Sequence, residues 1–399
     1  MNRRFQFAVV GISSVVVALL LFGAVGRSAS PDAPYTNLGV YSEVLSRIKA
    51  EYVEEPDMKA VTVGAINGML ESIDPHASYL NADQYKQYLK AKDAKKADIG
   101  LVGAKRVGYM AVEDAIPGSP ASKAGFATGD VIESINNVST RDMPLAFAEM
   151  LMQGDNGSSI EMGVLRVGRS EASKMMVNRA MISYPNVTSH LQGQVGVIQL
   201  ETLQPGRVKD VATQIVALEK QGAKKLVLDL RHCSTGLPEE GIALANLFME
   251  SGLITYTQGQ KVSKQEFQAS ANKAVTKLPL VVAVNRSTAG GAEIAAAALL
   301  NAKRAQVVGE RTYGDAGVRR AVALADGSAV ILSTAKYYSP DGKSIQDNGV
   351  TPNVLQVDTA AGGEAQSDDL PDSVDDATKT DAKKPVADEL LNKAIQLLQ

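Results

Sequence analysis

The sequence offers few side chains of the types that perform covalent catalysis or bind metals. Its 399 residues include one cysteine, Cys233, and three histidines, His76, His190 and His232. Neighbours on an extended chain point to opposite faces, so we do not expect His232 and Cys233 to form a catalytic couple. A single cysteine at the end of a strand is typical of a small buried apolar residue. The histidines lack the spacing of a zinc motif, so we expect no metal site and no cofactor.

The composition is that of an ordinary globular protein. It is 45% hydrophobic and 21% charged, with a net charge of -3, and the length suggests two or three domains. No run of Lys and Arg is interleaved with aromatic residues, so nucleic acid is not an expected partner. One cysteine cannot form a disulfide within the chain, and the cysteine count therefore does not indicate the redox compartment.

The amino-terminal residues predict a signal anchor over residues 1–30. Arg3 and Arg4 precede an uncharged stretch over residues 5–25, about the length of a membrane-spanning helix. The positive-inside rule keeps the basic end in the cytoplasm, so the bulk of the chain is expected in the periplasm or exterior. The alternative is a signal peptide cleaved near the small residues at 24–26. Under either interpretation, the rest of the chain is expected to be exported.

Apolar patterns divide the following residues into three parts. Apolar residues recur at helical spacing over residues 41–52 and 61–73, which predicts a helical region over residues 35–96. Residues 97–182 show strand and turn patterns with short helices. Residues 183–358 alternate strand and helix patterns, which indicates a mostly parallel sheet with crossover helices.

The carboxyl-terminal residues predict a tether and a short helix. Residues 359–387 are rich in Gly, Ser, Asp, Ala and Lys, so we expect them to be disordered. Residues 388–399 fit a short amphipathic helix, in which Leu390, Leu391, Ile395 and Leu398 supply the apolar face.

Five longer segments follow one another in a specific order. They read DPHASYLNADQY (74–85), IPGSPASKAGFATGDVIESIN (116–136), KKLVLDLRHCSTGLPEEGIALANLF (224–248), LVVAVNRSTAGGAEIAAAALLNAKRAQVVGERTYGDAGV (280–318) and AKYYSPDGKSIQDNGVTPNV (335–354). The ordered set resembles the C-terminal processing (tail-specific) serine protease family over about residues 35–357. The resemblance implies an α/β (α+β) protease core with an inserted PDZ domain and an N-terminal helical region.

The resemblance further implies that the PDZ domain binds protein or peptide C-termini as an added strand. Ile99, Gly100 and Leu101 form the candidate carboxylate loop, because Gly permits a close backbone approach. The alternative is a plain β-turn in a structural domain. Family members often carry an Arg before the Gly-rich turn that follows the second PDZ helix. This chain has Gln153 there, which puts the coupling between peptide binding and the core in doubt.

The residues that the family uses for catalysis are replaced. The family uses a Ser nucleophile, a buried neutral Lys as its base and a Gln that orients the Lys. Alignment through residues 292–294 puts Gly290, Asp315 and Arg319 at these positions. Gly290 has no side chain with which to form an acyl-enzyme, and Asp315 has nothing there to activate.

The oxyanion loop is altered as well. Where the family reads Pro-Gly-Gly, residues 234–236 read Ser-Thr-Gly, so Thr235 brings a Cβ atom to a position that needs backbone closeness. Gly236 and Gly291 are the remaining oxyanion candidates. Ser287 and Thr288 are fallback nucleophiles, although a shift of two or three residues moves the hydroxyl by several times the displacement that catalysis tolerates.

Three hypotheses about function follow. The protein is a catalytically inactive pseudoprotease that binds protein C-termini through its PDZ domain. Alternatively, it is an active serine-type endopeptidase of periplasmic proteins that uses Ser287 or Thr288. The third hypothesis is a structural partner that oligomerises with itself or with an active paralogue.

The uncharged segment 5–25 predicts where the protein is found. We expect a single-pass protein of the cytoplasmic membrane, because this segment is long enough to span it. Full-length protein should fractionate with membranes, and the region from Pro34 onward should be digested by protease added from the outer side. Recovery of the full-length chain in the cytosol would overturn the assignment.

Overall fold

The computed structural model of the protein describes most of the chain, namely residues 38–92, 96–141, 143–166, 168–358 and 388–399. The predicted membrane segment 5–25 and the predicted tether 359–387 lie outside these residues. Among the helices that are described, none has the length and apolar character needed to cross a membrane. The chain separates into two compact units, Met1–Val63 and Gly64–Gln399.

The described part of the first unit is helical. It contains α2 (Leu38–Glu51) and the first residues of α3 (Met58–Glu71). No side chain of α2 is buried. The second unit holds the remainder of α3, the short strand β1 (Ser78–Leu80) and α4 (Ala82–Lys92), followed by two larger domains.

The first of these domains is a small antiparallel sheet with the strand order β2-β3-β4-β6-β7, in which β5 pairs with β4. Its strands are β2 (Leu101–Arg106), β3 (Tyr109–Ala115), β4 (Val131–Ile135), β5 (Val138–Ser139), β6 (Ser159–Leu165) and β7 (Ser173–Asn178). Two short helices, α5 (Pro120–Ala124) and α6 (Leu145–Met152), belong to the same domain. Alternate residues of the strands, such as Met110, Ile132 and Ile160, form its core.

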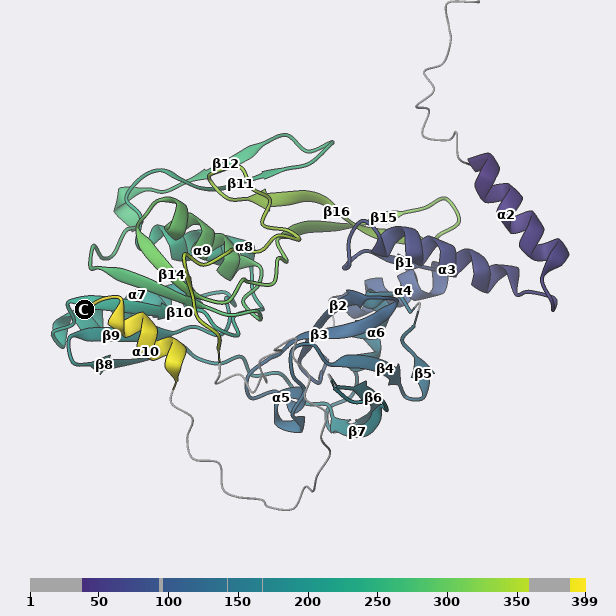
Figure 1. The fold of residues 1–399 in the computed structure, drawn as a ribbon, viewed down its shortest axis with the longest axis horizontal. Helices are drawn as coiled ribbons and strands as arrows, with labels where there is room; N and C mark the ends of the chain where they lie inside the picture. Colours follow the sequence, from purple (N-terminus) through teal and green to yellow (C-terminus); the bar gives the residue numbers. More distant parts are fainter. Residues whose placement is uncertain (1–37, 93–95, 142, 167, 359–387) are drawn as a thin grey trace, which may run out of the picture. The chain divides into compact units, whose positions relative to one another are not determined.

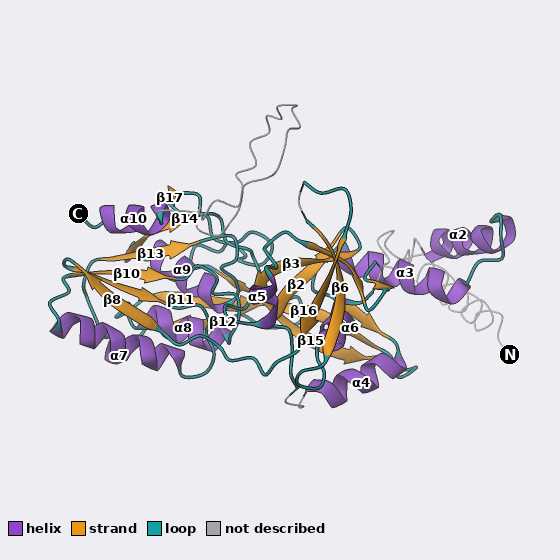
Figure 2. Ribbon diagram, turned by 90° about the horizontal axis from the view of Figure 1, so that it is seen from below, coloured by secondary structure: helices purple, strands orange, loops and turns teal. Residues whose placement is uncertain are grey.

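The second domain is built on a sheet in which β9, β10, β13, β14 and β17 run parallel and β8 pairs antiparallel with β9. The strands are β8 (Thr188–Gln192), β9 (Val195–Gln199), β10 (Lys225–Asp229), β13 (Leu280–Val284), β14 (Ala305–Gly309) and β17 (Val354–Leu355). The helices are α7 (Arg207–Lys220), α8 (Pro238–Asn246), α9 (Gly291–Asn301) and α10 (Glu389–Gln396). Figure 1 shows the path of the chain, and Figure 2 shows α10 on one side of these strands and α7 and α8 on the other.

Burial on both faces explains why the central strands read as continuous apolar runs. In β10, Leu226 and Leu228 belong to the core that includes α7, α8 and α9. Val227 lies between them in sequence and belongs to the opposite core, together with Leu390 of α10. The carboxyl-terminal helix therefore covers a face of the sheet that would otherwise be exposed.

A buried guanidinium connects α10 to the end of β10. Arg231 pairs with Asp229 and with Asp388, each at 2.7 Å, and with Asp358 at 3.2 Å. Burial on its own would lower the pKa of Arg231, but the three carboxylates outweigh it and raise that pKa. The ion-pair cluster thus joins the residues on either side of segment 359–387 to one side chain.

A third sheet has the order β1-β16-β11-β12, with β15 paired to β16. Its remaining strands are β11 (Leu253–Gln258), β12 (Gln265–Gln268), β15 (Gly317–Ala323) and β16 (Ala329–Tyr338), and a 3-10 helix η1 (Ala271–Lys273) follows β12. Because β1 and β15 both pair with β16, the residues that precede each of them are brought into the same region.

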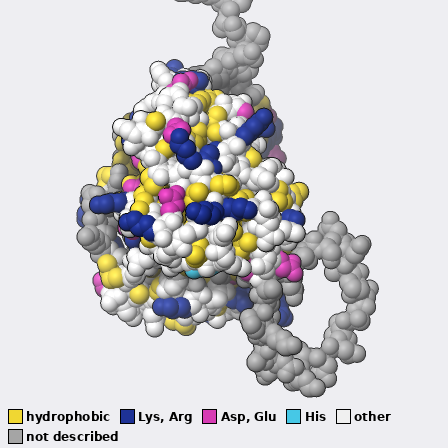
Figure 3. All heavy atoms as spheres, turned by 90° about the vertical axis from the view of Figure 1, so that its left-hand side faces the viewer, with side chains coloured by type: hydrophobic (Ala, Val, Ile, Leu, Met, Phe, Trp, Pro, Cys, Tyr) yellow, Lys and Arg dark blue, Asp and Glu magenta, His cyan; other side chains and the backbone are white. Residues whose placement is uncertain are grey.

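The predicted fold class is confirmed, since the described residues form an α/β core, a small antiparallel domain at the position of the predicted PDZ domain, here called the PDZ-type domain, and N-terminal helices. The sequence patterns missed several strands with polar or half-exposed side chains, β12 and β15 among them. Figure 3 shows the face at the left of Figure 1, where Lys and Arg side chains lie in separate groups among acidic and apolar ones.

Candidate functional site

The turn from β13 into α9 has the backbone geometry of a nucleophile elbow. Gly290 caps α9 with φ 62° and ψ -122°, a conformation that glycine adopts without steric cost. Such a sharp strand-to-helix turn presents a nucleophilic side chain in hydrolases that carry one. A Cβ atom built on Gly290 would have one neighbour within 4 Å, the carbonyl oxygen of Asp315 at 3.6 Å. There is room for a side chain, at a backbone strain of about 1–3 kcal/mol.

The carboxylate of Glu293 fixes the elbow to the loop that holds Asp315. It accepts hydrogen bonds from the backbone N–H groups of Gly290 (3.0 Å), Gly314 (2.7 Å) and Asp315 (2.9 Å), and from the Thr312 hydroxyl (2.5 Å). Glu293 is 0% exposed. Burial raises the pKa of Glu293 to about 7, while the four donors favour its ionised form. The positions that correspond to nucleophile and base are therefore held together by a third residue.

Asp315 is engaged in an ion pair with Arg319. The two guanidinium nitrogens of Arg319 contact the two carboxylate oxygens of Asp315, one of them at 3.3 Å. Burial alone would raise the pKa of Asp315, but the charges of His76 and Arg319 outweigh it and lower that pKa. A paired carboxylate of low pKa is a weak base, so the residue does not reproduce the chemistry of a neutral amine. The structure brings Gly290, Asp315 and Arg319 into one region.

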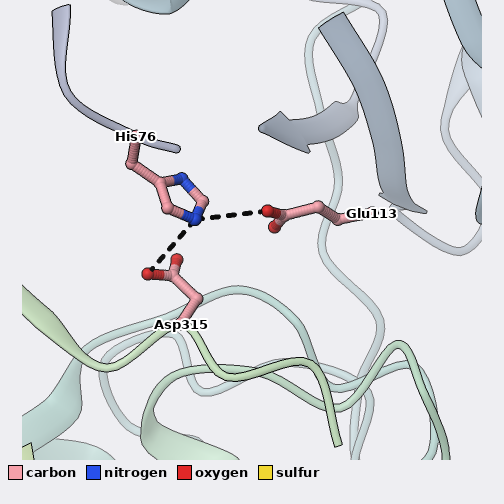
Figure 4. A group of neighbouring side chains, drawn as sticks. All are labelled: His76, Glu113 and Asp315. Atoms are coloured by element: carbon pink, nitrogen blue, oxygen red, sulfur yellow. Dashed lines mark ion pairs between the residues drawn. The ribbon is translucent and has the colours of Figure 1, made fainter. Parts of the chain in front are cut away.

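A cluster that sequence reasoning missed lies beside this pair (Figure 4). His76 Nε2 is 3.3 Å from Glu113 Oε1 and 3.7 Å from Asp315 Oδ1. His76 and Glu113 are 7% and 2% exposed, and the Asp315 side chain is 21% exposed. Burial lowers the pKa of His76 and raises that of Glu113 well above its ordinary value. The three side chains offer one nitrogen and carboxylate oxygens, all within 4.8 Å of one another, which is a set that can hold a metal ion.

Tyr313 closes one side of the cluster. Its ring lies edge-on to the His76 ring, with the centroids 6.3 Å apart, and its hydroxyl accepts a hydrogen bond from Arg106 at 3.2 Å. Burial and the nearby Glu113 carboxyl raise the pKa of Tyr313. The sequence analysis did not single out Glu113, which lies just after apolar residues in the region of strand and turn patterns, and nothing in the sequence pointed to its partners.

The altered oxyanion loop is fixed through its backbone. Thr235 O accepts from Leu203 N at 2.8 Å, and Leu237 N donates to Leu203 O at 2.9 Å. Gly236 lies between them with φ 126°, and a Cβ atom there would lie 2.2 Å from Leu203 O. A Cβ atom on Gly291 would lie 2.9 Å from Leu237 O. Both glycines are thus required by close packing.

The same loop binds the PDZ-type domain. Asp114, on β3, pairs with His232 Nδ1 at 3.2 Å and accepts a hydrogen bond from Ser234 Oγ at 2.7 Å. His232 therefore faces Asp114, while Cys233 is buried, and burial raises the pKa of its thiol. This arrangement is consistent with a packing role for the cysteine.

Ser287 and Thr288 are both buried. The Ser287 hydroxyl lies 2.7 Å from that of Thr128, which belongs to the PDZ-type domain. The Thr288 hydroxyl donates to Leu230 O at 2.9 Å and accepts from Asn285 N at 3.0 Å. Within the described ranges, the hydrogen-bond partners of these two hydroxyls are hydroxyl, carbonyl and amide groups, and none of these is a general base.

The candidate carboxylate loop is buried, and one of its backbone N–H groups already has a partner within the protein. Gly100 has φ 75°, and a Cβ atom there would lie 2.4 Å from Ser119 Cβ, while its N–H group donates to Asp98 Oδ1 at 2.8 Å. At the other end of β2, Lys105 N donates to Pro75 O at 2.9 Å. A peptide added to the outer edge of β2 therefore has the stretch from Leu101 to Ala104 to pair with.

Comparison with known proteins finds families that have the same two domains. The family model for Peptidase family S41 matches residues 194–356, and the model for a PDZ domain matches residues 112–166. The Carboxy-terminal processing protease CtpA of Bacillus subtilis (strain 168) is 32% identical over 363 residues, covering 89% of this chain and 78% of that protein. The chain belongs to the carboxyl-terminal processing proteases of family S41.

Other members of family S41 support the assignment. The Carboxyl-terminal-processing protease of Synechocystis sp. is 31% identical over 77% of this chain and 74% of its own length. The solved structure of the Photosystem II D1 C-terminal processing protease matches with a TM-score of 0.65 and 28% identity, covering 79% of this chain and 86% of that one.

The contact between His232 and Asp114 predicts a pH-dependent link between the PDZ domain and the core. Burial opposes protonation of His232, but the hydrogen bond and charge of Asp114 outweigh it and raise the pKa of His232. The contribution of this pair to stability is then fully present below the ordinary histidine pKa, about 6.5. It is lost as the pH rises through the raised pKa of the folded state.

An NMR titration of the imidazole signals checks this prediction. Asp114→Asn should lower the pKa of His232, whereas Ser234→Ala, which removes the other donor to the same carboxylate, should leave it raised. An unchanged His232 titration in Asp114→Asn would show that the pair does not set the pKa.

Proposed function

We propose that this family member is a catalytically inactive protein that binds protein C-termini through its PDZ domain. The observation that carries the proposal is the elbow itself, which keeps its backbone geometry with Gly290 in place of a nucleophile. The expected base position holds Asp315 in an ion pair with Arg319. No covalent acyl transfer can begin at a position without a side chain.

The remaining parts of the site do not compensate. Ser287 and Thr288 are buried and engaged with hydroxyl, carbonyl and amide groups. Thr235 occupies a position of the oxyanion loop where the family has Gly, and its carbonyl already accepts from Leu203. These contacts favour the inactive form over the alternative of an active endopeptidase with a displaced nucleophile.

The PDZ domain supplies the binding activity in this proposal. Such domains take up a peptide C-terminus as an added strand and hold its carboxylate by backbone N–H groups. The domain lies next to the elbow through the pairs Asp114–Ser234 and Thr128–Ser287. An occupied groove would therefore act on the loops around the former catalytic centre. We place this activity outside the cytoplasm, as the segment 5–25 predicts, with an active paralogue or a second copy as further candidate partners.

The proposal predicts that the protein does not cleave peptides. The purified full-length chain should release no fragments from unfolded proteins or tail peptides above background, measured by mass spectrometry, and a serine-directed covalent probe should not label it. Gly290→Ser should fold, because the added Cβ atom meets only Asp315 O at 3.6 Å, yet stay inactive, because Asp315 offers no neutral amine. Adding Asp315→Lys and Arg319→Gln should restore a trace at most, limited by Thr235.

Two single variants separate the alternatives. Robust wild-type turnover that Ser287→Ala or Thr288→Ala abolishes would establish the displaced-nucleophile mechanism instead. Turnover that neither change affects would indicate a contaminating peptidase, and active-site labelling of the preparation would identify it.

The proposal also predicts how the PDZ domain selects its ligands. Peptides with a free, apolar C-terminus should bind. The same peptides with an amidated C-terminus should bind at least about tenfold more weakly, because hydrogen bonds to the charged carboxylate are lost. Fluorescence anisotropy with a labelled peptide measures the difference. Equal affinity for acid and amide would count against the carboxylate loop.

A further inference from the structure

Three chemically suitable side chains converge from distant parts of the chain. His76 lies in the segment between α3 and β1, Glu113 lies on β3 of the PDZ domain, and Asp315 lies in the loop between β14 and β15. Figure 4 shows His76 Nε2 facing both carboxyl groups. The atoms of this group lie within 4.8 Å of one another.

The polar atoms that face one another are poorly satisfied. Among the residues that the structure describes, His76 Nε2 and both carboxyl oxygens of Glu113 are buried and make no hydrogen bond of normal geometry, and the group that interacts with the Glu113 carboxyl as a donor is the Tyr313 hydroxyl beside it. His76 and Glu113 are 7% and 2% exposed. Buried polar atoms are satisfied in nearly all proteins, so a group of such atoms aimed at one point indicates a missing partner, and an ion is one such partner.

We propose that His76, Glu113 and Asp315 form a binding site for a divalent transition-metal ion, with Zn²⁺ the best fit. Zinc takes imidazole nitrogen and carboxylate oxygen at about 2.0–2.2 Å, and tetrahedral ligands at that distance are about 3.4 Å apart. The separations of His76 Nε2 from Glu113 Oε1 and Asp315 Oδ1, 3.3 Å and 3.7 Å, are close to this value. Calcium and magnesium prefer oxygen-only sets, which a histidine does not suit. Water takes the fourth position, reached from the exposed edge of Asp315.

The surrounding charges are compatible with a bound cation. Two carboxylates face the site, and Arg319 supplies one opposing positive charge through its pair with Asp315. Arg319 also orients the Asp315 carboxylate, as groups next to metal ligands commonly do. A carboxylate has lone pairs enough to bind both a guanidinium and a metal ion.

The ion would connect three parts of the protein. One ligand belongs to the segment before β1, one to the PDZ domain and one to the protease-type core. Because the ligands come together only in the folded chain, binding stabilises the arrangement in which the PDZ domain contacts the core. This role does not depend on the proposed function, since it requires neither peptide binding nor the absence of catalysis.

The test uses the full-length protein, purified without a histidine tag and stripped of metal by a chelator. Titration with ZnCl₂ in a calorimeter should give one ion per chain, and Co²⁺ should give visible absorption bands of a low-symmetry site. Glu113→Gln and His76→Ala should weaken zinc binding by at least about 100-fold, since each removes a ligand. His190→Ala removes an exposed histidine on β8 and should bind zinc as the wild type does.

The outcomes are distinct. One-to-one binding that is lost in Glu113→Gln and His76→Ala, with circular dichroism showing both variants folded, supports the site. Absence of stoichiometric zinc binding by the wild type overturns it, whether or not the variants fold. Equal binding by wild type, Glu113→Gln and His76→Ala also overturns it, because the ion would then be held elsewhere.

Discussion

The buried carboxylate of Glu293 is the interaction on which the site depends. It gathers donors from the first turn of α9 and from the loop around Asp315, four hydrogen bonds in all. A carboxylate without water is costly unless such donors surround it. Its loss would free Gly290 and Asp315 from each other. Asp315 would then no longer be held beside His76 and Glu113. The positions that align with nucleophile and base are thus held together by a residue outside that set.

Close helix packing holds the elbow between β13 and α9 in place. A Cβ atom on Gly241 of α8 would lie 2.0 Å from the carbonyl oxygen of Gly291 in α9, so the two helices meet backbone to backbone. α9 is buried on all sides from Gly291 to Leu299, and its many small residues include the run from Ala295 to Ala298. These contacts fix the elbow through packing alone. The elbow therefore keeps its shape without any contact from a side chain at position 290.

The sequence was informative where local pattern and chain order decide the structure. Alternating strands and helices predicted the parallel core, and apolar spacing at Leu390, Leu391 and Ile395 predicted the last helix. The strands β12 and β15 escaped prediction because much of their surface faces solvent and their patterns lack apolar alternation. The cluster of His76 and Glu113 could not be predicted either. Their meeting depends on how the PDZ domain packs on the core, which local spacing does not encode.

The position of Arg231 has a consequence for the evolution of the chain. Asp358 and Asp388 bind the same guanidinium, so the two ends of segment 359–387 are held at one point. Changing the number of residues in such a closed loop costs little, about 0.6 kcal/mol for each doubling of its length. Insertions or deletions between the two aspartates can therefore accumulate without disturbing the sheet, while α10 stays in place as a separately attached cover.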